Sequence, residues 1–143
     1  FMILQYTAAA LLSENKSLCF PASADSIPTS LGQEDHVSMG SISARKTLRI
    51  IGNLEKILGI EMMTAAQGFD FRKPMKSGIL IDAAHKFIRE YVSFAEDDRI
   101  FSPDMAEAIL LVQSGTLIAH LNRVSQQHQL TFKNEDHELF GIY

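Results

Sequence analysis

The stretch from Val37 to Phe71, VSMGSISARKTLRIIGNLEKILGIEMMTAAQGFDF, is the longest continuous helical pattern in the chain. When residues are placed at 100° intervals, its main apolar members fall within about a quarter-turn of one another, and basic side chains occupy the other side. These apolar members are Val37, Leu48, Ile51, Leu58, Met62, Ala66 and Phe69. The pattern predicts one long amphipathic helix over residues 37–71.

The second half of this predicted helix is apolar on nearly every side, from Leu54 to Ala65. A helix with that character is typically buried all round. At about 1.5 Å per residue, residues 37–71 would span roughly 50 Å, whereas a compact domain of 143 residues is about 35 to 40 Å across. We therefore expect this helix to extend into an assembly that the chain alone does not complete.

The rest of the chain is also helical in pattern, which predicts an all-α fold with long antiparallel helices and a single helical region over residues 1–143. Ser102-Pro103-Asp104 is a typical helix start, with Ser102 as N-cap, and Gly115 is a natural stop. Helices are expected over residues 3–19, 79–94, 103–114 and 117–121, and the polar residues 126–143 are expected to form a tail.

A long loop is predicted over residues 20–33, between the first helix and the long one. Pro21, Pro28 and Gly32, together with several Ser and Thr residues, break the helical pattern there. Loops of this length inside a compact helical domain are uncommon, and they are disproportionately functional.

The composition is that of an ordinary soluble domain, with 46% hydrophobic and 21% charged residues. A net charge of −4 argues against a nucleic-acid partner, and no apolar run approaches the roughly 18 residues of a membrane span. Cys19 is the sole cysteine, so no internal disulfide can form, and we expect a cytoplasmic location. The chain begins with Phe1, directly in helical sequence, which indicates a piece of a longer protein.

Three ionisable residues, Glu34, Asp35 and His36, cluster where the long helix is expected to begin. Carboxylates are stabilised near helix N-termini, so Asp35 as a helix cap and His36 as a hydrogen-bonded structural residue explain the cluster without any catalysis. A metal site is not favoured, because three adjacent residues cannot all point at one ion. A nucleophilic triad is not favoured either, because the sequence has no nucleophile elbow.

An ordered series of motifs nevertheless resembles one family, the histidine and phenylalanine ammonia-lyases. The resemblance covers residues 1–72 and continues more loosely through residues 101–104. The motifs are QYTAAAL (5–11), SENK (13–16), PAS (21–23), DSIPTS (25–30), QEDHVSMG (33–40), ARK (44–46), IE (60–61) and AAQGFDFR (65–72).

The resemblance implies that the chain is the C-terminal part of a homotetrameric enzyme and contributes to its central helical bundle. Such an enzyme eliminates ammonia from L-histidine to give urocanate, a step of histidine degradation. The family's electrophile is a methylidene-imidazolone, which forms autocatalytically from an internal Ala-Ser-Gly. This chain has no such tripeptide: the nearest strings are Ala22-Ser23-Ala24 and Gln113-Ser114-Gly115. No residue here is therefore expected to form the cofactor, and the fragment alone is expected to be inactive.

Two residues match active-site positions of the family. Met2 corresponds to a methionine that lines the substrate side-chain pocket, although plain core packing also explains a Met at that position. Glu34 corresponds to a glutamate that faces the substrate imidazole, and it is the expected substrate-binding and catalytic residue. An imidazole N–H needs an acceptor, and a carboxylate accepts a stronger hydrogen bond than a neutral amide. In relatives that act on phenylalanine, the matching position looks like Gln. Glu34 therefore favours histidine as the substrate.

Two alternatives stay open from the sequence. The missing electrophile and the long apolar helix also fit a non-catalytic helical module that only oligomerises. Related aminomutases share the electrophile and re-add ammonia at the neighbouring carbon, and other lyases differ in substrate preference.

Overall fold

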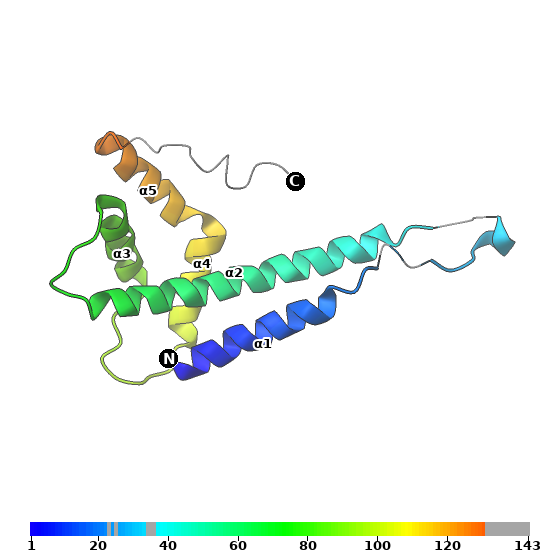
Figure 1. Cartoon of the computed structure of the whole chain (residues 1–143), viewed down its shortest axis with the longest axis horizontal. Helices are drawn as coiled ribbons and strands as arrows, with labels where there is room; N and C mark the ends of the chain where they lie inside the picture. Colours follow the sequence, from blue (N-terminus) through cyan, green and yellow to red (C-terminus); the bar gives the residue numbers. More distant parts are fainter. Residues whose placement is uncertain (23, 25, 34–36, 131–143) are drawn as a thin grey trace.

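The computed structural model describes residues 1–22, 24, 26–33 and 37–130 (Figure 1). Within this part the chain is built from α-helices and one short 3₁₀ turn, which confirms the all-α prediction. The elements are α1 (Met2–Leu18), η1 (Ser30–Gly32), α2 (Gly40–Asp70), α3 (Ile79–Tyr91), α4 (Ser102–Ser114) and α5 (Thr116–Gln127).

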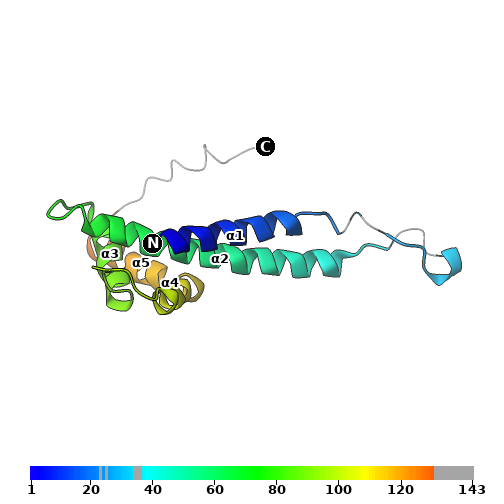
Figure 2. The same cartoon turned by 90° about the horizontal axis from the view of Figure 1, so that it is seen from below.

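The helices α1 and α2 form an antiparallel hairpin that sets the long dimension of the molecule (Figures 1 and 2). With 31 residues, α2 is about 46 Å long. The helix α1 runs alongside its middle, α4 crosses it, and α3 lies near its C-terminal end, with α5 packed against α3 and α4. The connection between α1 and α2 projects beyond both helices, away from the smaller ones.

The hydrophobic core lies where α2 meets α4, α3 and the start of α1. Met63 and Val92 are its largest fully buried side chains. The core cluster consists of Leu4, Ile60, Met63, Ala66, Phe87, Ile88, Val92, Ala108 and Leu111. Because these residues belong to the second half of α2 and its neighbours, the loop-bearing end of the hairpin has little core of its own.

The apolar face that periodicity predicts for α2 is only partly buried within this chain. Ala66 is buried in the core, but Leu48 remains 69% exposed and Ile51 46% exposed. The buried side also includes two polar residues, Asn53 and Gln67, whose amides are hydrogen-bonded. Hydropathy assigns such residues to the surface, so periodicity predicts the buried face only in part.

The expectation that the second half of α2 is buried all round is wrong for this chain. Leu54 is 47% exposed and Leu58 is 41% exposed. At 100° per residue, Leu48, Ile51, Leu54 and Leu58 fall within about a third of the helix circumference. These four residues are called the α2 apolar stripe below.

The helix ends differ slightly from the predictions. Ser102 is the first residue of α4 and Phe101 occupies the N-cap position, so the prediction of Ser102 as the cap is wrong by one residue. Gly115 ends α4 with a left-handed φ of 67°, as a C-terminal glycine is expected to do. The following helix is longer than expected and includes Gln126 and Gln127, the first residues of the predicted tail. Residues 131–143 of that tail lie outside the described part.

None of the helices in the described part combines the length and apolar character that a bilayer span requires.

Gly59 provides a test of the α2–α4 packing. A Cβ atom added to Gly59 would lie 2.9 Å from Ile109 Cγ1 and 3.0 Å from the Ile109 backbone nitrogen. We expect Gly59→Ala to lower the free energy of unfolding by about 1–3 kcal/mol, because the backbone of α4 must move. Gly52→Ala is the matched control on the same helix, since nothing lies within 4 Å of its added Cβ. That change should stabilise by about 0.5–1 kcal/mol. Denaturant unfolding measures both, and equal effects of the two substitutions would contradict the packing described.

Candidate functional site

The loop that carries the main predicted site residue connects α1 to α2. Glu34, with Asp35 and His36, lies outside the described residues, so the prediction for it remains a prediction. The described flanks are Gln33, which follows η1, and Val37, which precedes α2. Figure 1 shows η1 at the end of the molecule opposite the core.

The base of this loop is tied to α2 and to itself. The Lys46 ammonium group donates to the carbonyl of Phe20 and also lies 5.9 Å from the centroid of the Phe20 ring. Farther along, the backbone N–H of Val37 donates to Ser26 Oγ at 3.1 Å. The first bond fixes where the loop leaves α1, and the second joins its middle to its end.

The turn at the tip of the loop has an unusual backbone. Ser30 and Leu31 have φ angles of 52° and 56°, in the left-handed region, and Gly32 follows at 84°. Glycine adopts such a φ without penalty, but each of the other two residues costs on the order of 1–3 kcal/mol. Leu31 is fully exposed.

A polar cluster fixes the register of α1 against α2 near the loop. The buried Asn53 amide donates to Glu14 Oε2 at 2.7 Å and to Asn15 Oδ1 at 3.0 Å. Arg49 forms an ion pair with the same carboxylate. The hydrogen bond from Asn53 is the main reason that the pKa of Glu14 is lowered, and Arg49 adds to the effect. These contacts hold the end of α1, and with it the start of the loop, at one position along α2.

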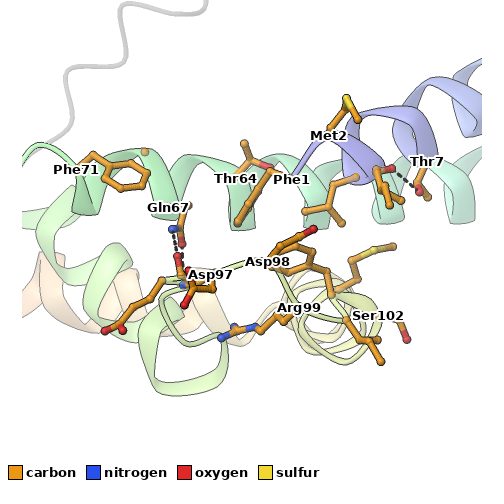
Figure 3. Close-up of a pocket in the computed structure, with 18 residues that line it drawn as sticks. Phe1, Met2, Thr7, Thr64, Gln67, Phe71, Asp97, Asp98, Arg99 and Ser102 are labelled. Atoms are coloured by element: carbon orange, nitrogen blue, oxygen red, sulfur yellow. Dashed lines mark hydrogen bonds between the residues drawn. The ribbon is translucent and has the colours of Figure 1, made fainter.

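The second predicted site residue, Met2, lies at the rim of a large open cavity (Figure 3). The cavity has a volume of about 990 Å³ and lies between the start of α1, the end of α2 and residues 95–102. Its lining is largely apolar. Met2 is 70% exposed, and its thioether points away from Asp97 and Arg99 on the other wall. Met2 is therefore not packed into the core of this chain.

One wall of the cavity is fixed by Gln67, which the sequence analysis did not select. Its amide nitrogen donates to the carbonyl of Ala95 at 2.8 Å, and its amide oxygen accepts from the Ala95 N–H at 3.2 Å. Both residues are buried. This pair of bonds attaches the segment after α3 to the C-terminal part of α2.

An ionic cluster centred on the buried carboxylate of Asp70 lies beside Gln67, whose amide oxygen is 3.4 Å from Arg89 Nη2. Arg89 donates from Nε to Asp70 Oδ2 at 2.7 Å and from Nη1 to the carbonyl of Val92 at 2.8 Å. Lys73 Nζ lies 2.6 Å from Asp70 Oδ1. His85 Nε2 lies 3.2 Å from Asp70 Oδ2, a close contact without the direction of a good hydrogen bond.

The charge state of Asp70 follows from this cluster. Burial alone would raise the pKa of its carboxyl, but the contacts with Lys73, His85 and Arg89 outweigh burial and lower the pKa to about 2. The motif AAQGFDFR marked this end of α2 as part of the resemblance. Because the partners His85 and Arg89 come from α3, no local pattern on α2 could have revealed them.

The described residues place Met2 far from the start of the loop between α1 and α2, and Glu34 itself lies outside them. Met2 is the first residue of α1, and the loop follows its last residue, Leu18. A helix of 17 residues is about 25 Å long. In both views the loop extends farther away from the start of α1, not back toward it.

The string Gln113-Ser114-Gly115, one of the two nearest to Ala-Ser-Gly, has a structural role at a helix junction. Gly115 is the left-handed junction between α4 and α5. The hydroxyl groups of Ser114 and Thr116 lie 2.9 Å apart across that junction. The other string, Ala22-Ser23-Ala24, includes Ser23, which lies outside the described part.

The helical hairpin, the loop and the cavity wall are features of an established family. Residues 1–90 match the family described as aromatic amino acid lyase. The chain belongs to that family.

Among curated relatives, a histidine ammonia-lyase from Natranaerobius thermophilus is 50% identical over 123 residues, which is 86% of this chain and 24% of the relative. The chain thus spans about a quarter of the length of the relatives it matches. The structure of a histidine ammonia-lyase from Trypanosoma cruzi superimposes with a TM-score of 0.83 and 42% identity, covering 87% of this chain and 24% of that one. A tyrosine aminomutase from Streptomyces globisporus superimposes with a TM-score of 0.81 and 32% identity, covering 86% and 23%.

The Asp70 cluster predicts how stability depends on pH. The carboxyl pKa falls from an ordinary 3.8 to about 2 on folding, so its contribution is fully present above pH 3.8 and is lost as the pH falls through about 2. Asp70→Asn should lower the free energy of unfolding by about 2 kcal/mol at neutral pH and flatten the pH dependence between about 4 and 2. Urea unfolding at several pH values measures both effects.

Asp97→Asn, at an exposed carboxylate, is the control for Asp70→Asn. A loss of stability in Asp70→Asn that stays constant down to pH 2 would show that the charge of Asp70 is not responsible.

Proposed function

We propose that the full-length protein containing this chain is a histidine ammonia-lyase, which eliminates ammonia from L-histidine to give urocanate in histidine degradation. The observation that supports this most strongly is the 50% identity to a curated histidine ammonia-lyase over 86% of the chain. The family match covers residues 1–90, which include both helices of the hairpin and the loop between them. The chain alone is proposed to be inactive, because it holds only part of the site.

Glu34 is the residue of this chain that we assign to the substrate. A histidine side chain presents a ring N–H, and an ionised carboxylate is the acceptor that binds such a donor most strongly. A phenyl or phenol ring offers no N–H at that position, so a carboxylate facing it would lose hydration without a partner. Glu34 therefore selects histidine over phenylalanine and tyrosine.

The electrophile is proposed to come from a part of the full-length protein outside this chain. A methylidene-imidazolone is an electron-poor group that activates the amino acid for loss of its amino group. The residues of this chain do not form it, and their assigned roles are binding and positioning.

We further propose that the active protein is a homo-oligomer, a tetramer as in the resembling family. The α2 apolar stripe is exposed in the single chain, with exposures of 41 to 69%, and a second copy of α2 would cover it. The separation of Met2 from the loop supports the same proposal. The loop that carries Glu34 begins about 25 Å from Met2, at the other end of a 17-residue helix, so we propose that each substrate meets Met2 of one subunit and Glu34 of another.

A cytoplasmic location is part of this proposal. It is supported by the single cysteine, Cys19, and by the metabolic chemistry of the relatives. No nucleic acid or membrane partner is proposed.

A tyrosine aminomutase has the same helical scaffold, with a TM-score of 0.81. The lyase is preferred here because identity to the histidine ammonia-lyase structure is higher, 42% against 32%, and because Glu34 suits an imidazole.

Kinetics of the full-length protein test the role of Glu34. Elimination from L-histidine is followed by the absorbance of urocanate. Glu34→Gln should lower kcat/KM for histidine about ten- to hundredfold, because a charge-assisted hydrogen bond to the imidazole becomes a neutral one. The same variant should lose much less activity toward phenylalanine, if wild-type activity on that substrate can be measured.

The matched control is Glu107→Gln, an exposed glutamate on α4. Its kinetics should equal those of the wild type. An unchanged kcat/KM in Glu34→Gln would refute the role of Glu34, and formation of β-histidine in place of urocanate would favour an aminomutase.

A further inference from the structure

The cavity between the start of α1, the end of α2 and residues 95–102 has exposed apolar side chains along its walls (Figure 3). Ile3, Phe71 and Ile100 line it, with exposures of 73%, 72% and 82%. Large apolar side chains that gather around a hollow mark an interaction surface, because a partner that covers them removes apolar area from water. The described chain therefore presents a surface that is suited to being covered.

A glycine in the lining of the cavity points to the same conclusion. Gly68 belongs to α2, lines the cavity and is exposed. Within the part of the chain that the structure describes, nothing lies within 4 Å of the Cβ that alanine would add there. Glycine weakens a helix relative to alanine, but it lets another backbone approach closely. Gly68 therefore fits a helix against which a segment from outside the described residues packs.

The size and polarity of the cavity suit a peptide segment better than a free amino acid. Its volume is about 990 Å³ and its lining is largely apolar. Pockets for drug-sized ligands have volumes of about 300–1,000 Å³, and histidine is smaller than such a ligand. The ammonium and carboxylate groups of an amino acid also need polar partners. Met2 stands at the rim and points away from Asp97 and Arg99, so a substrate contact at Met2 is compatible with a segment docked in the cavity.

The charge along one wall indicates the chemistry of that segment. Glu96, Asp97 and Asp98 are consecutive, exposed and part of the lining. The next residue, Arg99, pairs with Asp104 at 2.9 Å, so its charge is already compensated. A negative wall favours a partner with Lys or Arg side chains.

The other segments of this chain lack that complementarity. Residues 131–143 contain one lysine and three acidic residues, and the whole chain has a net charge of −4. The curated relatives, in contrast, are about four times as long as the matched part of this chain, which covers 24% of one of them. Most of a full-length protein of that size lies outside this chain.

We propose that this cavity is the docking surface for a segment of the full-length protein that lies outside this chain. The segment is apolar, carries a basic side chain that reaches the carboxylates of residues 96–98, and packs its backbone near Gly68. This inference goes beyond the proposed function and rests on one part of it, that the chain acts within a full-length protein.

Photo-crosslinking in the full-length protein identifies the occupant. Phe71 is replaced by p-benzoyl-phenylalanine, which keeps an aromatic ring at an exposed position of the cavity. After irradiation and digestion, mass spectrometry should find residue 71 joined to an apolar peptide from outside residues 1–143. The matched control has the same amino acid at Tyr91, an exposed aromatic residue on α3 that does not line the cavity. Position 91 should not be joined to that peptide.

A charge reversal tests the acidic wall. In the Phe71 photo-crosslinking variant, Asp98→Lys should lower the yield of the cross-link on the order of fivefold, because it replaces an attraction with a repulsion. Glu107→Lys makes the same change of charge at an exposed residue of α4 outside the cavity. The yield in Glu107→Lys should equal that of the parent variant.

A larger side chain at Gly68 tests the close approach. Gly68→Leu favours the helix and has room for its Cβ within the described chain. A docked segment would lose the space that it occupies, so the Tm of the full-length protein should fall by several degrees. Ala106→Leu, at an exposed position of α4 outside the cavity, is the control and should leave the Tm nearly unchanged.

Three results would overturn the inference. These are a position 71 that forms no cross-link beyond those of position 91, a cross-link to residues 131–143 or to a second copy of residues 1–130, and a Gly68→Leu protein with the wild-type Tm or a higher one. None of them bears on histidine elimination, which is measured separately by urocanate formation. A full-length protein that forms the expected cross-link but has no activity on histidine would reject the proposed activity and leave the docking surface standing.

Discussion

The antiparallel contact between α1 and α2 is the constraint on which the rest of the structure depends. At one end Leu4 of α1 joins the core around Met63. At the other end Asn53 holds Glu14 and Asn15 by direct hydrogen bonds. The apolar end provides stability and the polar end provides register. Because the loop begins where α1 ends, the register of this pair decides where the loop projects from the molecule.

Buried polar groups carry much of the specificity of this fold. Asn53 and Gln67 lie on the buried side of α2, and each amide has its partners. Unpaired, such groups would cost about 1–3 kcal/mol each. Paired, they select one arrangement of the helices over others of similar hydrophobic content. The Asp70 cluster does the same for α3, since Arg89 joins Asp70 to the carbonyl of Val92.

Helix existence was readily predictable from local pattern, and helix faces were not. The alanine-rich run around Ala8 predicted α1, and Gly115 predicted the end of α4. Both predictions agree closely with the structure, because helix propensities and caps are local. The buried face of α2 was predicted only in part, because Asn53 and Gln67 look like surface residues until their partners on other segments are known. Leu48 shows the opposite: it is apolar, yet it is 69% exposed in the part of the chain that the structure describes.

The candidate site shows the same division. Ordered motifs identified the family and assigned Glu34 and Met2, but no spacing rule could show how far Met2 lies from the start of the loop, at the other end of α1. Contacts such as Ser26 with Val37, or Arg89 with Asp70, depend on how the chain folds back and have no local signature.

The central claim is that this chain contributes to two different substrate sites, with Met2 at one and Glu34 at the other. The most direct test is an experimental structure of the full-length protein with L-histidine bound. We predict that each imidazole lies within about 3 Å of a Glu34 carboxylate oxygen and that the Met2 lining the same pocket belongs to a different subunit. A substrate contacted by Met2 and Glu34 of one chain, or an imidazole with no carboxylate beside it, would contradict the account.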